Sequence, residues 1–381
     1  MRALMTATVP SMIGQFNMNN IKLLLELGYE VDVACNFNDR SVWSDEKVET
    51  LKNTLHDMNV KTYQIDFERN MFKINNHLKS YHQIKKLMNL REYNLIHTHT
   101  PISSLITRIA FKNSNIFNKC RMIYTAHGFH FFKGNNPINN FIFKNIEKYG
   151  AKYTDTLITI NKEDYEAAKK FKLRKNGTVE YVPGVGIDIE KINSIEGNRE
   201  KLLEELNISN DSILLLSVGE LNENKNHRIV IEALPLLPAN VHYLICGVGS
   251  LKNQYFQLAK DLNVENRLHL LGYKDNIIEI MKSCDIFIFP SKREGLSVAL
   301  MEAMTCGLPC IVSAIRGNVD LIIGDKTGYV CKKNSDYKKF ILKFMIEKEY
   351  KQIIINNART IITNFDKKNV LNTISNLYKV N

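Results

Sequence analysis

The chain has 381 residues, of which 44% are hydrophobic and 9% aromatic, so it is long enough for two domains with full cores. No uncharged apolar run reaches 18 residues, which excludes a predicted transmembrane helix, and the N-terminus becomes polar too early for a signal peptide. The seven cysteines are scattered without the spacing of a zinc site, which predicts reduced thiols in a cytoplasmic protein.

The net charge of +11 is spread unevenly along the chain. Residues 69–175 hold 20 lysines and arginines but only 6 acidic residues, a net charge of +14, so the remainder sums to −3. A basic block of this size indicates an anionic partner such as nucleic acid, a phosphosugar or an acidic lipid surface. A merely solvated basic surface is the alternative.

Strands and helices alternate through the first half of the chain, which predicts a doubly wound α/β domain over residues 1–184. A turn containing Gly14 follows the first strand. Strands are expected at 2–8, 29–36, 60–65, 93–99, 121–127, 156–161 and 178–183, and helices at about 16–27, 44–57, 72–91, 103–112 and 162–172.

The turn-rich segment 183–192 predicts a domain junction, after which the pattern restarts in a second α/β domain. Strands are expected at 213–218, 241–246, 268–271, 285–290, 310–313 and 328–331, with helices between them and a helical stretch at about 349–379. The second domain therefore spans about 185–364.

The segment 289–310 combines a strand, a short loop and a helix that Ser297 can cap. In a parallel sheet this places a helix N-terminus at the carboxyl edge, where anionic ligands bind. Glu294 lies in the loop, and Glu302 lies among apolar residues of the helix. Its charge needs a hydrogen-bond partner or a ligand, unless it faces solvent.

Other predicted strand ends carry polar and glycine-rich turns. Gly219 and Lys225 follow the strand 213–218, and Gly247 follows the next strand; a lysine there suits a phosphate, although it could be merely solvated. Such loops converge at one sheet edge, which predicts a ligand held between facing edges of the two domains.

Four histidines stand at strand ends of the first domain. They are His97, His99, His127 and His130. No carboxylate set lies near them, so hydrogen bonding to a hydroxylated substrate is favoured over metal binding.

Together these segments resemble retaining GT-B glycosyltransferases of the GT4 family, especially bacterial members that build capsule and exopolysaccharide. The matching segments are the Gly14 turn, NLIHTHTP (94–101), YTAHGFHF (124–131), PGVGID (183–188), SVGELNENKN (217–226), CGVGS (246–250), LGYKDNI (271–277) and E-x7-E from Glu294 to Glu302. The resemblance implies two Rossmann-like domains facing across a deep cleft. The first (1–184) would bind the acceptor and the second (185–364) the nucleotide sugar, with a C-terminal helix at about 365–381 packing back onto the first.

The resemblance also implies residue roles. Glu294 would contact donor-sugar hydroxyls, Glu302 the ribose and Lys225 the diphosphate, while His127 would lie beside the reacting centre. Further donor contacts are expected from Gly14, Gly219, Gly247, Tyr273, Gly295, Leu296 and Ser297, with the 272–276 turn at the base. Most of the family has arginine where this chain has Glu220, and we hypothesise that Arg293 supplies the missing charge.

The implied reaction is retaining transfer of a sugar from a nucleotide donor, expected to be a UDP-sugar, to a polyprenyl-diphosphate-linked glycan. No metal or other cofactor is expected, and the leaving phosphate would take the acceptor's proton during front-face attack. The basic block would bring the protein to the inner face of the bacterial plasma membrane as a peripheral protein. The expected contacts are Lys85, Lys86, Arg108, Lys112, Phe131, Phe132, Lys133 and Lys144.

Two other classes of function are considered. A GT-B-fold UDP-sugar epimerase would need its acid/base carboxylates and histidines placed differently, and a phosphorylase-like enzyme would be far longer and would bind pyridoxal phosphate. A basic nucleic-acid-binding protein would explain the charge, but no base-stacking or helix-turn-helix signature accompanies it.

Overall fold

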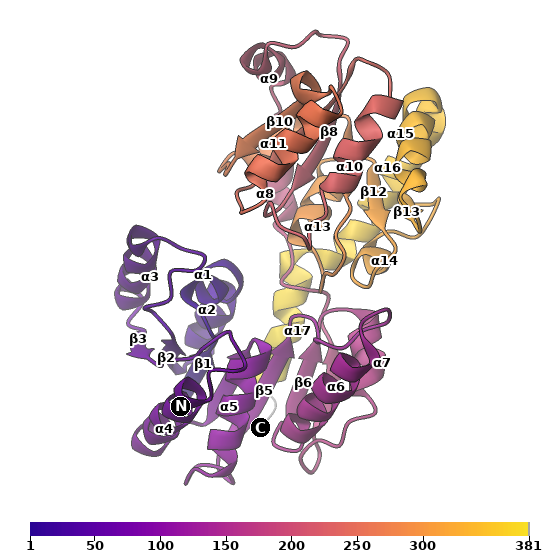
Figure 1. The fold of residues 1–381 in the computed structure, drawn as a ribbon. Helices are drawn as coiled ribbons and strands as arrows, with labels where there is room; N and C mark the ends of the chain where they lie inside the picture. Colours follow the sequence, from indigo (N-terminus) through magenta and orange to yellow (C-terminus); the bar gives the residue numbers. More distant parts are fainter. Residues whose placement is uncertain (380–381) are drawn as a thin grey trace. The chain divides into compact units, whose positions relative to one another are not determined.

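The computed structural model describes residues 1–379, and the chain forms two α/β units (Figure 1). The first unit comprises residues 1–185 and the chain from 370 onward, and the second comprises 186–369. The change of unit after residue 185 falls one residue beyond the predicted boundary. The last helix begins in the second unit and continues into the first; residues 380–381 of its predicted range lie outside the described residues.

The first unit is built on a seven-stranded sheet in the order β3-β2-β1-β4-β5-β6-β7, and every pairing is parallel. Its strands are β1 (Arg2–Thr6), β2 (Glu30–Cys35), β3 (Lys61–Gln64), β4 (Leu95–His99), β5 (Arg121–Ala126), β6 (Thr156–Thr159) and β7 (Thr178–Tyr181). The central strands are buried on both faces. β1 and β5 are accordingly mostly apolar, whereas β4 ends in the buried polar residues His97, Thr98 and His99.

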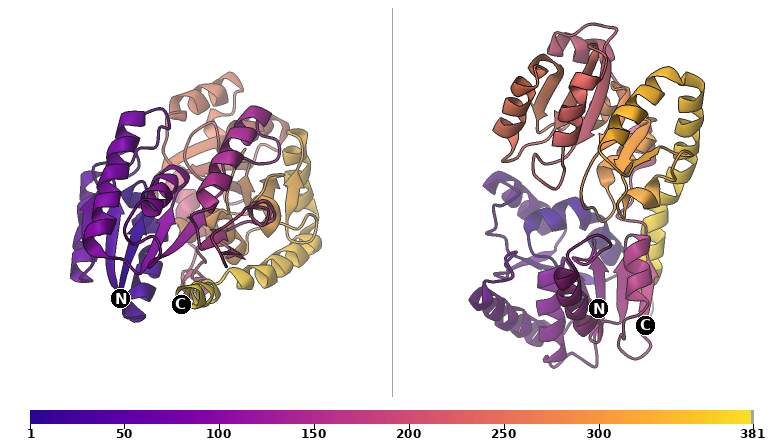
Figure 2. Two further views of the ribbon diagram at one scale, coloured as in Figure 1. Left: turned by 90° about the horizontal axis from the view of Figure 1, so that it is seen from below. Right: turned by 45° about the vertical axis from the view of Figure 1, so that its right-hand side comes forward.

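Helices cover both faces of this sheet (Figures 1 and 2). One apolar core contains residues of α1 (Pro10–Phe16), α2 (Met18–Glu26), α3 (Asp45–Asp57) and α17 (Lys367–Lys379). Two further cores involve α4 (Ile74–Arg91), α5 (Pro101–Lys112), α6 (Pro137–Ala151) and α7 (Lys162–Ala168). Val370, Ile374 and Tyr378 anchor α17 in the first core.

The predicted turn at Gly14 is wrong. Gly14 lies inside α1, and a Cβ atom built on it would overlap the ring of Trp43. Asn17 is buried between α1 and α2, where its side-chain amide donates to the carbonyl of Met12 at 2.9 Å. Thus α2 is the helix expected at 16–27, whereas α1 lies where a turn was expected, and Gly14 is needed for packing against Trp43.

The second unit contains a six-stranded parallel sheet in the order β10-β9-β8-β11-β12-β13. Its strands are β8 (Ile213–Val218), β9 (Val241–Cys246), β10 (Leu268–Gly272), β11 (Ile286–Phe289), β12 (Cys310–Ser313) and β13 (Tyr329–Cys331). The order changes direction at β8, so β8 and β11 are central and their carboxyl ends lie side by side. Ligands of open α/β sheets bind at such a switch point.

Two apolar cores enclose the sheet of the second unit. One includes α8 (Ile189–Ser194), α9 (Arg199–Leu206), α12 (Ile277–Lys282), α13 (Val298–Thr305), α14 (Asn318–Leu321) and α16 (Lys348–Ile362). The other includes α10 (Arg228–Ala233), α11 (Lys252–Asp261) and α15 (Ser335–Ile346). Short 3-10 turns lie at Leu234–Leu236, Glu265–Arg267 and Thr363–Phe365.

The predicted helical stretch at 349–379 is interrupted before α17. Asp366 is extended and forms a parallel bridge with Ile187. The amide of Ile187 donates to the carbonyl of Phe365 at 3.0 Å, and the amide of Lys367 donates to the carbonyl of Ile187 at 2.8 Å. These bonds break the helix where the chain passes from one unit to the other. None of the helices described over residues 1–379 is long and apolar enough to cross a membrane.

Candidate active site

The segment between β11 and α13 forms the loop and helix start expected from the sequence. β11 ends at Phe289, and α13 begins at Val298. The hydroxyl of Ser297 accepts a hydrogen bond from the amide of Leu300 at 3.3 Å, so Ser297 is the N-cap. Because β11 is a central strand, this helix N-terminus lies at the carboxyl edge near the switch point, where its dipole favours an anion.

Lys225 and Glu294 form an ion pair at this edge. The Lys225 ammonium lies 2.7 Å from a Glu294 carboxylate oxygen, and their side chains are 20% and 14% exposed. The Lys225 ammonium also lies 4.8 Å from the centre of the Phe289 ring. A Cβ atom at Gly219 would lie 3.0 Å from the Lys225 side chain, so glycine leaves room for the lysine. The structure therefore joins two residues that the sequence placed in separate loops.

Backbone hydrogen bonds fix the loop that carries Glu294. The amide of Lys292 donates to the carbonyl of Asn224 at 2.7 Å, and the Asn224 side chain donates to the carbonyl of Arg293 at 3.0 Å. On its other side, Nε of the buried Arg316 donates to the carbonyl of Glu294 at 3.2 Å. The 290–297 loop is thus held from both sides before any ligand binds, as preorganised binding requires.

Three glycine turns of the second unit meet at the same edge. The amide of Gly219 donates to the carbonyl of Cys246, and the amide of Gly247 donates to the carbonyl of Gly272, at 2.9 and 2.8 Å. A Cβ atom at Gly247 would overlap the carbonyl of Gly219. These glycines permit close approach of the backbones, and they bring the predicted strand-end turns together.

The carboxylate of Glu302 is half-buried on α13. Burial raises its pKa to about 7. Among the described residues, no side chain or amide forms a hydrogen bond or ion pair with it. Two other charged residues considered from the sequence are more accessible than Glu302: Arg293, in the 290–297 loop, and Glu220, which follows β8, both have exposed side chains. The apolar helix therefore carries a half-buried carboxylate that no protein group within residues 1–379 pairs with, which leaves it to a ligand or to solvent.

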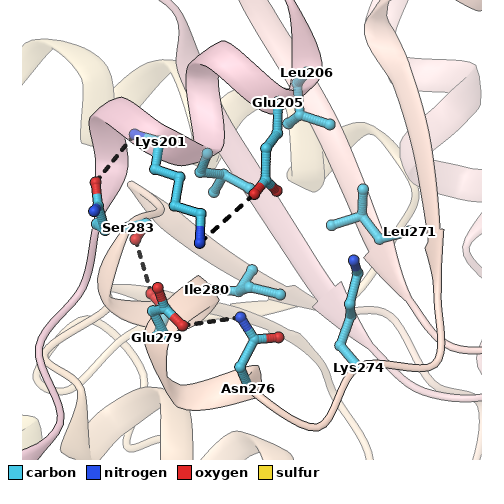
Figure 3. A pocket seen from close by; sticks show the side chains of 11 residues that line it. Lys201, Glu205, Leu206, Leu271, Lys274, Asn276, Glu279, Ile280 and Ser283 are labelled. Carbon is cyan, nitrogen blue, oxygen red and sulfur yellow. Dashed lines mark hydrogen bonds and ion pairs between the residues drawn. The ribbon is translucent and has the colours of Figure 1, made fainter.

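A separate cavity of about 250 Å³ lies between α9 and α12 (Figure 3). Lys274 and Asn276 of the predicted base-contacting turn line it, whereas Lys225, Glu294 and Glu302 do not. The Lys201 ammonium and the Glu205 carboxylate, one turn apart on α9, form an ion pair at 3.9 Å in one wall of this cavity. Tyr273, the residue of this turn that was expected to contact the donor, has an exposed side chain and does not line the cavity.

In the first unit, three of the four expected histidines form a chain at the carboxyl edge. Nδ1 of His99 lies 3.0 Å from Nε2 of His127, and the rings of His97 and His99 are 4.1 Å apart. Burial lowers the pKa of His97 to about 3 and that of His127 to about 4, so these rings are neutral at pH 7. His130 is not in the chain; its ring packs edge-on against Phe143.

Hydroxyl groups brace the turn that follows His99. Thr100 has φ +66°, which is strained for a β-branched residue. Its hydroxyl lies 2.7 Å from that of Thr8 and 2.6 Å from that of Ser103. This network holds the strained turn at the end of β4, beside the histidines.

A small cavity of about 20 Å³, room for one water molecule, adjoins the histidine chain. His99, Thr125 and His127 line it on the sheet side. Asn17 and the helix residues Phe16, Asn19, Asn20, Val370, Leu371 and Ile374 contribute to the other walls. His99, Thr125 and His127 are therefore placed where they can hydrogen-bond a small polar group in this cavity.

Two of the expected membrane contacts are wrong. Arg108 is fully buried; it forms an ion pair with Glu147 at 3.1 Å and stacks on Tyr124. Phe131 is buried against Phe129, with ring centres 4.8 Å apart. Tertiary contacts satisfy both side chains, so neither is available to a bilayer. Of the other candidates, Lys86, Lys112 and Lys133 are exposed, and Lys85, Phe132 and Lys144 are partly exposed.

Sequence reasoning missed an exposed apolar face on α6. It consists of Ile138, Phe141, Ile142 and Tyr149, and their spacing of three, four and eleven residues from Ile138 places them on one side of the helix. Ile138 is 69% and Phe141 73% exposed. The helical spacing was visible in the sequence, but which side of α6 faces the sheet was not.

No group of three or more metal-ligating side chains occurs anywhere in residues 1–379. Glu294 pairs with Lys225 instead, and His97, His99 and His127 take part in side-chain hydrogen bonds.

Both halves of the chain match known families. Residues 198–361 match the family described as glycosyl transferases group 1, and residues 14–161 match glycosyl transferase 4-like proteins. The putative glycosyltransferase EpsD of Bacillus subtilis is 31% identical over 335 residues, which cover 87% of this chain and 83% of EpsD. The chain belongs to the group 1 glycosyltransferases. It is an enzyme of the transferase class, as its sequence motifs indicated.

Further likenesses agree with this family. An Escherichia coli UDP-Gal:α-D-GlcNAc-diphosphoundecaprenol α-1,3-galactosyltransferase is 31% identical to this glycosyltransferase over 311 residues, 79% of each chain. Anabaena HepE, solved with UDP and glucose, superposes with a TM-score of 0.77 at 17% identity over 99% of both chains. The two parallel sheets and this likeness confirm the GT-B fold, and the comparisons favour glycosyl transfer over epimerisation or nucleic-acid binding.

Proposed function

We propose that this glycosyltransferase moves a sugar from a UDP-sugar to a polyprenyl-diphosphate-linked glycan and retains the anomeric configuration. The observation that carries the proposal is the arrangement of Lys225, Glu294 and the N-terminus of α13 at the switch point of the second sheet. It offers a cation and a helix dipole to a diphosphate, next to a carboxylate that can bind sugar hydroxyls.

Each group has a distinct role in this proposal. Lys225 exchanges its partner Glu294 for the donor diphosphate, and the charge that develops on the leaving group is stabilised by Lys225 and by the amides of residues 295–297. Glu294, released from Lys225, accepts hydrogen bonds from the sugar. Glu302 accepts hydrogen bonds from the ribose, which would satisfy its unpaired carboxylate.

In the first unit, neutral His127 hydrogen-bonds a substrate hydroxyl. The leaving phosphate takes the proton of the attacking acceptor hydroxyl on the same face of the sugar, so no protein nucleophile is needed.

We also propose that the reaction needs no divalent metal, because Lys225, Arg293 and the helix dipole offset the charge of the diphosphate. Full activity in the presence of EDTA is the expected result.

The acceptor proposal rests on related proteins. The Escherichia coli relative is named for a diphosphoundecaprenol acceptor, and a Campylobacter jejuni relative, 25% identical over 96% of this chain, is an N,N'-diacetylbacillosaminyl-diphospho-undecaprenol α-1,3-N-acetylgalactosaminyltransferase. We also propose that the reaction belongs to capsule or exopolysaccharide biosynthesis.

A lipid-linked acceptor requires the enzyme to approach a bilayer. We propose that it binds peripherally to the inner face of the bacterial plasma membrane, and that α6 is part of the contact. Its exposed apolar face is flanked by Lys144, Lys148 and Lys152, and its one acidic residue, Glu147, is buried against Arg108. An amphipathic helix with lysines and no exposed acid suits an anionic lipid surface.

The proposal is tested by screening UDP-sugars for thermal stabilisation and then assaying transfer from the best donor to polyprenyl-diphosphate sugars. Nuclear magnetic resonance of the product determines whether the anomeric configuration is retained, and a reaction without acceptor reports any epimerisation. Transfer with retention is expected. Stabilisation by no UDP-sugar, or conversion of the donor without acceptor, would contradict the proposal.

A further inference from the structure

Three side chains at the carboxyl edge of the first sheet form a continuous hydrogen-bonded chain. Met5 lies on β1, His99 ends β4 and His127 follows β5. Nε2 of His99 lies 3.1 Å from Sδ of Met5, and Nδ1 of His99 lies 3.0 Å from Nε2 of His127. Both ring nitrogens of His99 are therefore occupied, and the proton on each of these contacts can be assigned.

The contact with Met5 determines the tautomer of His99. A thioether sulfur can accept a hydrogen bond but has no proton to give, so Nε2 of His99 must carry the proton. Burial and the neighbouring histidines lower the pKa of His99 well below its usual value, so the ring is neutral. A neutral ring protonated at Nε2 has a bare lone pair at Nδ1. The proton shared with His127 must then belong to His127.

The same reasoning determines which nitrogen of His127 remains free. Burial keeps His127 neutral, and its single proton lies on Nε2, where it is donated to His99. We propose that Met5 and His99 fix His127 in the Nε2–H tautomer, so that Nδ1 is a standing hydrogen-bond acceptor beside the small cavity. Met5 and His99 are thus positioning residues that act through His127.

The neighbouring His97 is fixed by a different set of contacts. Its Nδ1 lies 2.7 Å from the hydroxyl of Tyr378, and its Nε2 lies 2.8 Å from the hydroxyl of Thr125. No other partner for the Tyr378 hydroxyl occurs among the residues described, so the phenol donates to His97 and His97 donates to Thr125. The His97 ring packs against the His99 ring with the planes tilted by 41°, but it does not decide the tautomer of His127.

The tautomer selects the chemistry of the ligand that His127 can meet. A lone pair at Nδ1 accepts a hydrogen bond from a hydroxyl group and repels a phosphate or carboxylate. The ligand group is therefore a hydrogen-bond donor without negative charge, and, on the proposed function, it is a hydroxyl of the sugar substrate. An analogue with fluorine in place of that hydroxyl cannot donate and should be a poorer substrate.

The test is histidine nitrogen spectroscopy of the full-length protein without donor. The protein has ten histidines, and the signals of His99 and His127 are assigned from the His99→Gln and His127→Gln variants. The expected result is the Nε2–H tautomer for His127 at pH 7. Met5→Leu removes the sulfur acceptor, so His99 and His127 should each show a second tautomer, and kcat should fall about two- to tenfold with little change in donor KM.

Met122→Leu is the matched control, because Met122 is a fully buried methionine of the same unit that belongs to a different apolar core from Met5. It should change neither the tautomer nor kcat. An Nδ1–H tautomer of His127 in the wild-type protein overturns the proposal, as does an unchanged tautomer in folded Met5→Leu. If Met5→Leu does not fold, the wild-type spectrum alone decides. Because the spectrum is recorded without donor, a failure of the proposed reaction would leave this result intact.

Discussion

Lys225 and Glu294 neutralise each other across 2.7 Å in the donor-free enzyme, although each has a proposed partner on the donor. Donor binding would therefore replace one ion pair by two separate interactions, so the two residues should not respond alike to substitution. Lys225→Ala should weaken binding of UDP itself by about 10- to 100-fold, because a charge-assisted contact to the diphosphate is lost.

Glu294→Gln should have the opposite effect on UDP. Without the carboxylate, Lys225 is free for the diphosphate, so UDP affinity should be unchanged or tighter, while transfer slows by about 100- to 1000-fold. Calorimetry with UDP and a transfer assay separate the two effects. Equal losses of UDP affinity in both variants would contradict the roles assigned to the pair.

Arg293 is exposed beside Glu294, and Glu220 occupies the position at which the resemblance led us to expect an arginine. If Arg293 supplies the missing charge, Arg293→Ala should weaken UDP binding by about tenfold or more, approaching the loss in Lys225→Ala. Lys292→Ala is the control, because Lys292 is an exposed neighbour that pairs with Glu223 at 3.4 Å. Unchanged affinity in Arg293→Ala would disprove the substitution hypothesis.

Glu302 should make donor binding depend on pH. With a pKa of about 7, its carboxylate is about one-tenth ionised at pH 6 and about nine-tenths at pH 8. The ionised form is the stronger acceptor for ribose hydroxyls, so affinity for a UDP-sugar, whose phosphates keep their charge, should rise over this range. Glu302→Gln should flatten the profile, and a slope that persists in this variant would assign the titration elsewhere.

The same residue affects stability in the opposite direction. The pKa of Glu302 is higher in the folded donor-free enzyme than in the unfolded chain. Its contribution to the free energy of unfolding is therefore most favourable below the unfolded pKa and is lost as the pH rises through about 7. Glu302→Gln should therefore raise the melting temperature of donor-free enzyme more at pH 8 than at pH 5. Equal shifts at both pH values would show that burial does not penalise this carboxylate.

The exposed face of α6 should contribute to vesicle binding. Phe141→Ser should weaken binding to anionic vesicles by about tenfold or more, because a large apolar side chain no longer inserts. Phe256→Ser is the control, since Phe256 is an exposed aromatic residue on α11 in the second unit. High salt should release the wild-type protein in part; no release would disprove the electrostatic component.

Arg108 should affect stability instead of membrane binding. Arg108→Ala leaves Glu147 buried without its cation and should lower the free energy of unfolding of the first unit by about 3–5 kcal/mol. Vesicle binding of the folded variant should remain at the wild-type level. Denaturant unfolding and vesicle sedimentation below the melting temperature test the two statements separately, and weaker sedimentation of folded Arg108→Ala would restore Arg108 as a membrane contact.

The sequence by itself determined features that depend on neighbours along the chain. Strands buried on both faces have apolar runs, which are nearly continuous in β8 and β11, and the ends of these two strands were predicted to within one residue. The N-cap at Ser297 follows from a side chain and an amide three residues apart. The apolar neighbours of Glu302 likewise indicated that its carboxylate needs a partner, a ligand or solvent.

Only the tertiary structure decided which distant side chains meet. Gly14 packs against Trp43, and Arg108 is neutralised by Glu147, so a residue expected in a turn lies in a helix and one expected at the surface is buried. Met5 and His99 are 94 positions apart in the sequence and touch because β1 lies beside β4. The order of strands and the faces that helices present arise from packing of the whole unit, and these contacts determine which tautomer His127 adopts and which charges remain exposed.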